Sequence, residues 1–112
     1  MELLLMVLNK EEYLDDVLAA FLEVGIKGAT VIDSTGMGAI LSHDVPIFAG
    51  LRQLMRGERP YNKTIFATIE SKEQVDELIS ILKEIGLDFK VPGAGVIITL
   101  PVNRKIGCIS EK

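Results

Sequence analysis

Apolar residues at the start of the chain follow two successive patterns, a continuous run and then a helical stripe. Residues 3–8, LLLMVL, form a short uninterrupted run, which is typical of a strand buried on both faces. After this run, apolar residues recur at helical spacing; they are Leu14, Val17, Leu18, Phe21 and Leu22. Asn9 and Glu12 predict a capped helix start, and Gly25 predicts the helix end. A second strand is expected from about residue 29 to residue 34.

The second half of the chain repeats this pattern. Residues 62–70, NKTIFATIE, alternate apolar with polar or small residues and predict a strand. Ser71, with Gln74 as its capping-box partner, predicts a helix start, and Gly86 predicts the end of that helix. The apolar stripe between them consists of Val75, Leu78, Ile79, Leu82 and Ile85. After the break VPGAG, residues 96–102, VIITLPV, predict the last strand.

The order strand, helix, strand therefore occurs twice within a single domain, residues 1–112. It predicts an α+β fold of the split βαβ, ferredoxin-like type (βαβ-βαβ), with one antiparallel sheet and both helices on one face. The other face of such a sheet stays bare, and the mean hydropathy of +0.33 is high for a small monomer. We therefore expect a homo-oligomer in which a partner subunit covers the bare face.

A long connection, residues 36–60, separates the two halves. Connections of this length in a compact domain are usually functional or disordered. Between Pro46 and Gly57 the segment has the pattern of a short amphipathic helix, which suits contact with a protein partner. We interpret residues 38–60 as a partner-binding loop; its predicted contact residues are Ile47, Phe48, Leu51, Arg52, Met55 and Arg56.

Charge and cysteine content narrow the class of protein. The net charge of −4 argues against a sequence-independent nucleic-acid binder, which usually shows a basic field. No apolar run approaches the length needed to span a bilayer, so membrane insertion is not expected. The opening MELLLMVLNKEE has no basic n-region and is followed at once by acids, so we do not interpret it as a signal peptide. A single cysteine, Cys108, cannot form an internal disulfide and suits the cytoplasm.

Two glycine turns are the main candidates for ligand contact. STGMG follows the second predicted strand, and PGAG, residues 92–95, precedes the last. Two glycines let a backbone approach an anion closely, but no Walker lysine follows STGMG, and on spacing alone a plain turn is favoured. In a split βαβ sheet the end of the second strand and the start of the last can lie at the same edge of an oligomer, so the two turns could line one cleft. In that case Gly36 and Gly38 would act as a hinge where the long loop leaves the sheet.

Metal binding and covalent catalysis have little support in the sequence. His43 and Asp44 are adjacent, a poor arrangement for two ligands of one ion, and one His and one Cys give no zinc spacing. Ser34, Thr35, His43 and Cys108 form no recognisable nucleophile–base pattern. We expect neither a metal site nor a catalytic residue.

The segment GIKGATVIDSTGMG, residues 25–38, resembles the PII signalling-protein family, whose second strand reads G-x-x-G-x-T-V and ends in G-x-G. The likeness continues through the long connection and ends in GAGVIITLPV, residues 93–102, so it covers nearly the whole chain. It implies a homotrimer of ferredoxin-like subunits with inward-facing sheets. It also implies intersubunit clefts for an adenine nucleotide effector (ATP, ADP or AMP) and a loop that controls a regulated enzyme or transporter.

The resemblance also implies which residues form the cleft. Thr30, Gly36 and Gly38 match positions that line the nucleotide cleft from one subunit. Gly93 and Gly95 match the glycine turn that faces the phosphates. The predicted ligand-binding set is completed by the neighbours Met37 and Ala94 and by Arg104 and Lys105 of the tail, residues 103–112.

Three departures from the family bear on the ligand. Ala94 and Val96 stand where the family usually has an acid and a lysine, and the expected basic pair of the tail is not reproduced. Ile40 stands where the family has a glutamine used with 2-oxoglutarate. Charge-assisted contacts supply much of any phosphate affinity, so we expect ATP binding to be weak, altered or absent.

Two other functions compete with this interpretation. A small ferredoxin-like oligomeric enzyme, of the isomerase or monooxygenase type, needs a titratable group on the sheet face, where the predicted strands offer almost none. A metal-responsive trimer resembling the copper-tolerance family needs more metal ligands than this chain supplies.

Overall fold

The computed structural model describes residues 1–44 and 61–107. Within them, the strands are β1 (Glu2–Leu8), β2 (Thr30–Thr35), β3 (Tyr61–Ile69) and β4 (Gly95–Pro101). The helices are α1 (Leu14–Glu23), α2 (Met37–Asp44) and α4 (Lys72–Glu84), and a single 3₁₀ turn, η1 (Glu11–Tyr13), precedes α1. The predicted α+β class is confirmed, and the predicted strand ends differ from the observed ones by one residue.

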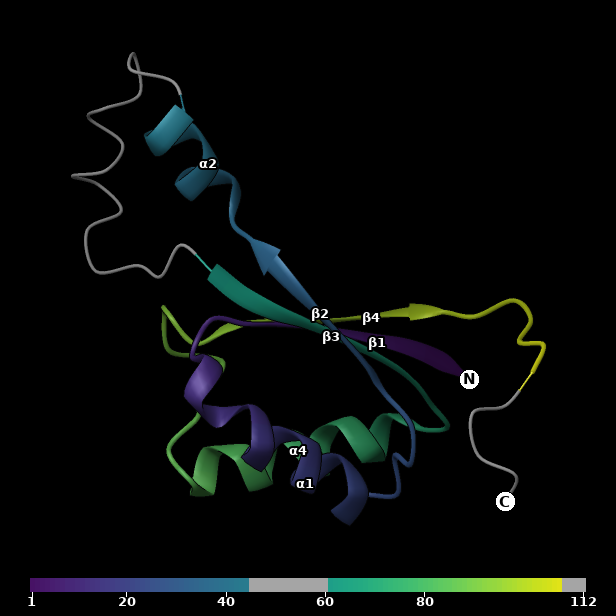
Figure 1. Cartoon of the computed structure of the whole chain (residues 1–112). Helices are drawn as coiled ribbons and strands as arrows, with labels where there is room; N and C mark the ends of the chain where they lie inside the picture. The colour runs from purple at the N-terminus through teal and green to yellow at the C-terminus, as the bar shows by residue number, and fades with distance from the viewer. Residues whose placement is uncertain (45–60, 108–112) are drawn as a thin grey trace.

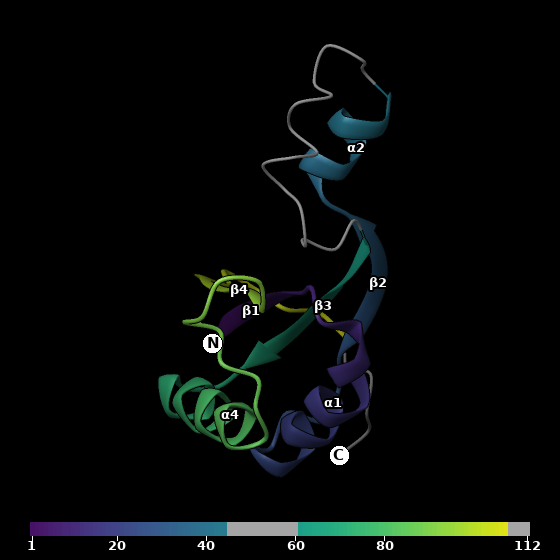
Figure 2. The ribbon, with the colours of Figure 1, turned by 90° about the vertical axis from the view of Figure 1, so that its left-hand side faces the viewer.

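The strands form one sheet in the order β2-β3-β1-β4, and each neighbouring pair is antiparallel. β1 and β3 are central, so β2 and β4 are the edges. Figures 1 and 2 show α1 and α4 together on one face of this sheet. The predicted antiparallel sheet with two helices on one face is therefore observed, and the arrangement is compatible with a ferredoxin-like fold.

The core lies between the sheet and the two helices. Alternate residues of the central strands point into it, as period-two side-chain geometry requires. Its largest fully buried side chains come from β1, β3 and the helices; they include Leu4, Met6, Leu8, Ile65, Ile69, Val17, Phe21, Leu78 and Leu82. The prediction of a first strand buried on both faces holds for one face only, because Leu3, Leu5 and Val7 are half-buried. Among residues 1–44 and 61–107, no layer covers that second face.

Both helices end at the predicted glycines. Gly25 and Gly86 have positive φ angles of 91° and 100°, which residues with a Cβ rarely adopt. In each case the N–H of the following residue donates to a carbonyl of the last turn at 2.8 Å. This is the Schellman pattern, which satisfies carbonyls left without helical partners.

The two helix starts differ from each other. At α4 the capping box is confirmed: Gln74 Oε1 accepts from the N–H of Ser71 at 3.3 Å. The Nε2 of Gln74 also donates to the Val24 carbonyl at 3.1 Å, tying this helix start to the end of α1. The predicted Asn9 cap is wrong, because the chain enters α1 through η1 and neither element has a side-chain cap. The Asn9 side chain instead contacts Asn62.

The start of the expected loop is helical. α2 begins directly after Gly36, so STGMG ends a strand and opens a helix instead of leading into irregular chain. Met37 and the following Ala, Ile and Leu residues favour helix strongly enough to outweigh Gly38. Figure 1 shows α2 beyond the end of β2, away from the layers formed by the sheet and the other helices. None of the described helices is long and apolar enough to cross a membrane.

Gly95 is required by close packing of the backbone. Its φ angle is +139°, and a Cβ at this position would lie 1.9 Å from the carbonyl oxygen of Val7. Gly36 differs, since a Cβ there would meet nothing within 4 Å.

We expect Gly95→Ala to lower the unfolding free energy by at least about 2 kcal/mol, because β1 and β4 must separate to admit the methyl group. Gly36→Ala, the matched control, should change it by less than about 0.5 kcal/mol. Urea denaturation at equal protein concentration measures both values. Equal stability of the two variants would contradict the packing argument.

Candidate functional site

The predicted ligand residues divide between the two ends of the sheet. Thr30 begins β2 opposite Phe66, and Lys105 contacts β3 at the same end through Thr68. At the other end, Gly36 follows β2 and Gly95 begins β4. Antiparallel register holds these two groups apart within one chain.

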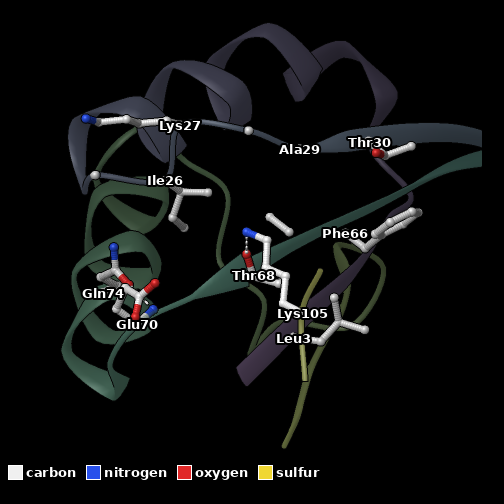
Figure 3. A pocket seen from close by; sticks show the side chains of 13 residues that line it. Leu3, Ile26, Lys27, Ala29, Thr30, Phe66, Thr68, Glu70, Gln74 and Lys105 are labelled. Carbon is white, nitrogen blue, oxygen red and sulfur yellow. Dashed lines mark hydrogen bonds between the residues drawn. The ribbon is translucent and has the colours of Figure 1, made fainter. Parts of the chain in front are cut away.

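A pocket of about 350 Å³ lies at the Thr30 end. It opens where the pairing of β2 with β3 stops: the last paired row is Thr30 with Phe66, and residues 26–29 before it belong to no strand. Figure 3 shows the side chains that line this pocket, including those of β3 and of the segment before β2. We call this space the entry pocket; its lining comprises residues 25–30, Leu3, Phe66, Ala67, Thr68, Glu70, Gln74 and Lys105.

The entry pocket combines apolar walls with a few polar groups. Leu3, Ile26 and Phe66 supply apolar surface. Lys105 Nζ donates to Thr68 Oγ1 at 2.9 Å, and in Figure 3 the lysine lies across the pocket. This chemistry suits a small molecule with an apolar or planar part and a negatively charged or hydrogen-bonding part.

The opposite end contains the PGAG turn. Gly93 has a φ of +97° and open space around the position of a Cβ, so the turn conformation alone accounts for this glycine. Ala94 is only 1% exposed, and its carbonyl accepts from the Asn9 N–H at 3.0 Å. Met37, which follows β2 at the opposite edge of the sheet, is 75% exposed. Val96 is 45% exposed and offers no charge.

A polar cluster near this end was missed by the sequence reasoning. Asn62, only 8% exposed, donates through Nδ2 to Asn9 Oδ1 at 3.2 Å. Ser34 Oγ donates to Asn62 Oδ1 and lies 2.8 Å from Thr64 Oγ1. Ser34, Asn62 and Thr64 lie in short polar stretches of β2 and β3, and these stretches are a sequence signal that could have identified them.

Beside this cluster, Lys63 bridges two acidic residues. Its Nζ pairs with the carboxylate of Asp33 and lies 3.7 Å from Glu11 Oε1. A second hollow of about 410 Å³ is lined by these groups with Ser34, Thr35, Tyr61 and Asn62. The hydrogen bond to Asp33 raises the pKa of Lys63 above its ordinary value of 10.5, and the Glu11 charge adds to this shift. A lysine held in its charged form is a poor nucleophile or base at neutral pH.

Some predicted residues contribute nothing to these sites or cannot be placed. Arg104 is exposed on the tail. The six predicted partner-contact residues between Ile47 and Arg56 lie outside the described residues, as does Cys108. Across residues 1–44 and 61–107, no group of three or more His, Cys, Asp or Glu side chains could hold a metal ion.

Lys63→Met should destabilise the protein at pH 7, and this effect should shrink at high pH. A pKa raised in the folded state means that the contribution of Lys63 is complete below the unfolded pKa and is lost as pH rises through the folded pKa. Urea denaturation from about pH 7 to about pH 11.5 measures the loss of unfolding free energy. Lys83→Met, which changes an exposed lysine of α4, is the control. A difference that stays constant over this whole range would refute the ion-pair explanation.

Comparison with known proteins adds no assignment: no protein-family model and no curated protein matches this chain.

Proposed function

We propose that the protein is a non-enzymatic, homotrimeric regulator of the PII type. A small anionic effector, in our proposal an adenine nucleotide, binds in clefts between subunits, and residues 38–60 act on a regulated enzyme or transporter in the cytoplasm. The observation that carries the proposal is the division of the predicted ligand residues between opposite ends of the sheet. Two half-sites held apart within one chain can form one cleft only across a subunit boundary.

The uncovered face of the sheet supports self-association. By register, Leu5 shares this face with Phe66 of β3 and Ile98 of β4. The exposed fractions of Val96, Ile98 and Leu100 on the edge strand β4 are 45%, 47% and 42%. A contiguous apolar surface of this kind marks an interface more often than a solvated face. Packing three copies through it is the arrangement that the family resemblance implies.

The order of elements supports the same proposal. Each half of the chain runs strand, helix, strand, and the two halves interleave in the sheet order β2-β3-β1-β4. This order supports the βαβ-βαβ ferredoxin-like fold that the proposal requires. By register, the central strands give the uncovered face apolar and hydroxyl side chains such as Val7, Thr64 and Phe66, together with the amide of Asn62. A general acid or base would have to come from elsewhere.

The entry pocket supplies one half of the proposed cleft. The Thr30 hydroxyl and the Lys105 ammonium are suited to a sugar hydroxyl and an anionic group, and Phe66 offers a flat apolar wall for a base. At the other half, Val96 gives no cation for a phosphate chain. We therefore place AMP and cyclic nucleotides beside ATP and ADP among the effectors to be tested.

The first test of this function is subunit number. Native mass spectrometry of the wild-type chain should show a trimer, and Ile98→Asp should dissociate it, because a charge cannot be buried unpaired in an apolar interface. Leu22→Asp is the matched control: Leu22 is 65% exposed on α1, on the helical face of the molecule, and its substitution should leave the trimer intact. A wild-type monomer would refute the trimeric proposal.

The second test is effector binding by calorimetry with ATP, ADP, AMP and cyclic nucleotides. For whichever nucleotide binds, Lys105→Gln should lower the affinity by about tenfold, which is the order of one lost charge-assisted contact. Lys83→Gln, which changes an exposed lysine of α4, should not weaken it. An intact trimer that binds none of these nucleotides would eliminate the nucleotide version of the proposal.

A further inference from the structure

We infer that Asn9 and Asn62 form a hydrogen-bonded bridge that couples the PGAG turn to the end of β2, where α2 begins. The bridge joins two segments that lie at opposite edges of the sheet. Its links are backbone and side-chain groups of Ala94, Asn9, Asn62 and Ser34.

The links follow the order of the strands. The Asn9 N–H donates to the Ala94 carbonyl at 3.0 Å, which connects the start of β4 to the end of β1. Asn62 Nδ2 donates to Asn9 Oδ1 at 3.2 Å and extends the connection to β3. Ser34 Oγ donates to Asn62 Oδ1 and completes it at β2. The hydrogen bonds thus cross the whole end of the sheet without a gap.

Asn62 is the residue that links the contacts of the bridge to one another. It is a buried polar residue, 8% exposed, and each end of its amide has a partner. The amide is planar, so a rotation that breaks the contact with Asn9 also displaces the acceptor of Ser34. Leaving a buried amide unsatisfied is costly, which favours the state with both contacts made over states with one.

The bridge lies where the backbone pairing of β3 with β1 stops. β1 ends at Leu8, whose partner in β3 is Lys63. The rows beyond it, Ser34 with Asn62 and Thr35 with Tyr61, pair only β2 with β3. Past Leu8, side-chain contacts of Asn62 with Asn9 and of Lys63 with Glu11 link this two-stranded ribbon to the β1–α1 turn. These contacts contribute to the position of the ribbon and of α2 after it.

A regulatory use of the bridge rests on the proposed function: an effector that shifts the PGAG turn would move the origin of the partner-binding segment. The coupling itself exists or fails without any effector. We therefore test it in the ligand-free protein, so that a failure to bind nucleotides and a failure of coupling are separate results.

The experiment is a double-mutant cycle read by residue-resolved amide hydrogen exchange. Gly93→Ala strains the turn through its positive φ, without a steric contact, and should raise exchange in residues 33–37 by about threefold or more. In an Asn9→Ala background the same substitution should leave exchange in residues 33–37 unchanged. Asn103→Ala, which alters an exposed asparagine of the tail, is the control background and should preserve the Gly93 effect.

Two near-isosteric variants separate the bridge from a general structural role. Asn9→Asp keeps the oxygen that accepts from Asn62 and should preserve the coupling, whereas Asn62→Asp removes the donor and should abolish it. Asn62→Asp also replaces Asn9→Ala if that variant does not fold, and Pro92→Ala replaces Gly93→Ala. The inference is overturned if the turn substitution leaves residues 33–37 unaffected in the wild-type background. It is equally overturned if its effect persists after the bridge is removed.

Discussion

One-sided burial of the sheet is the constraint on which the rest of the structure depends. Leu4, Met6 and Leu8 of β1 are fully buried against the helices, while the residues between them face the other way and are half-buried. Because a strand alternates its side chains, a strand made almost entirely of apolar residues needs a layer on each face. The chain supplies one layer from α1 and α4. The described residues offer no layer for the other face, which another molecule would supply. This need is the reason to expect assembly.

The same sheet also determines where a ligand can bind. The entry pocket exists because β2 stops pairing with β3 at Thr30, which leaves the preceding chain free to form a wall. In the proposed cleft it would be a half-site, because its polar groups, Thr30 and Lys105, stand at one end of the sheet and the glycine turns stand at the other. The proposed trimer requires that unlike ends of different copies meet. In that proposal, assembly and ligand binding both follow from the uncovered face.

The features that could be predicted from the sequence are those set by near neighbours. Gly25 and Gly86 end their helices because the left-handed conformation there is a local requirement, and Gln74 caps α4 from within the same turn. Thr30 and Lys105 were predicted as ligand residues, but the remaining walls of the pocket depend on strand register and carry no local signal. Asn9 shows the limit most clearly. It has the residue type and spacing of a cap, yet its side chain bonds to Asn62, 53 residues away, and tertiary contact overrides the local preference.

The centre of the sheet and its α2 end thus differ in the kind of interaction that holds them. Apolar contacts and backbone pairing hold the central rows, and these interactions resist even small displacements of one strand against another. The α2 end is held by a few directional contacts around Asn62 and Lys63, each worth little alone and dependent on its neighbours. A segment attached in this way can change position while the core keeps its packing. Such an attachment suits the origin of a partner-binding segment, because a signal must move that segment without unfolding the domain that carries it.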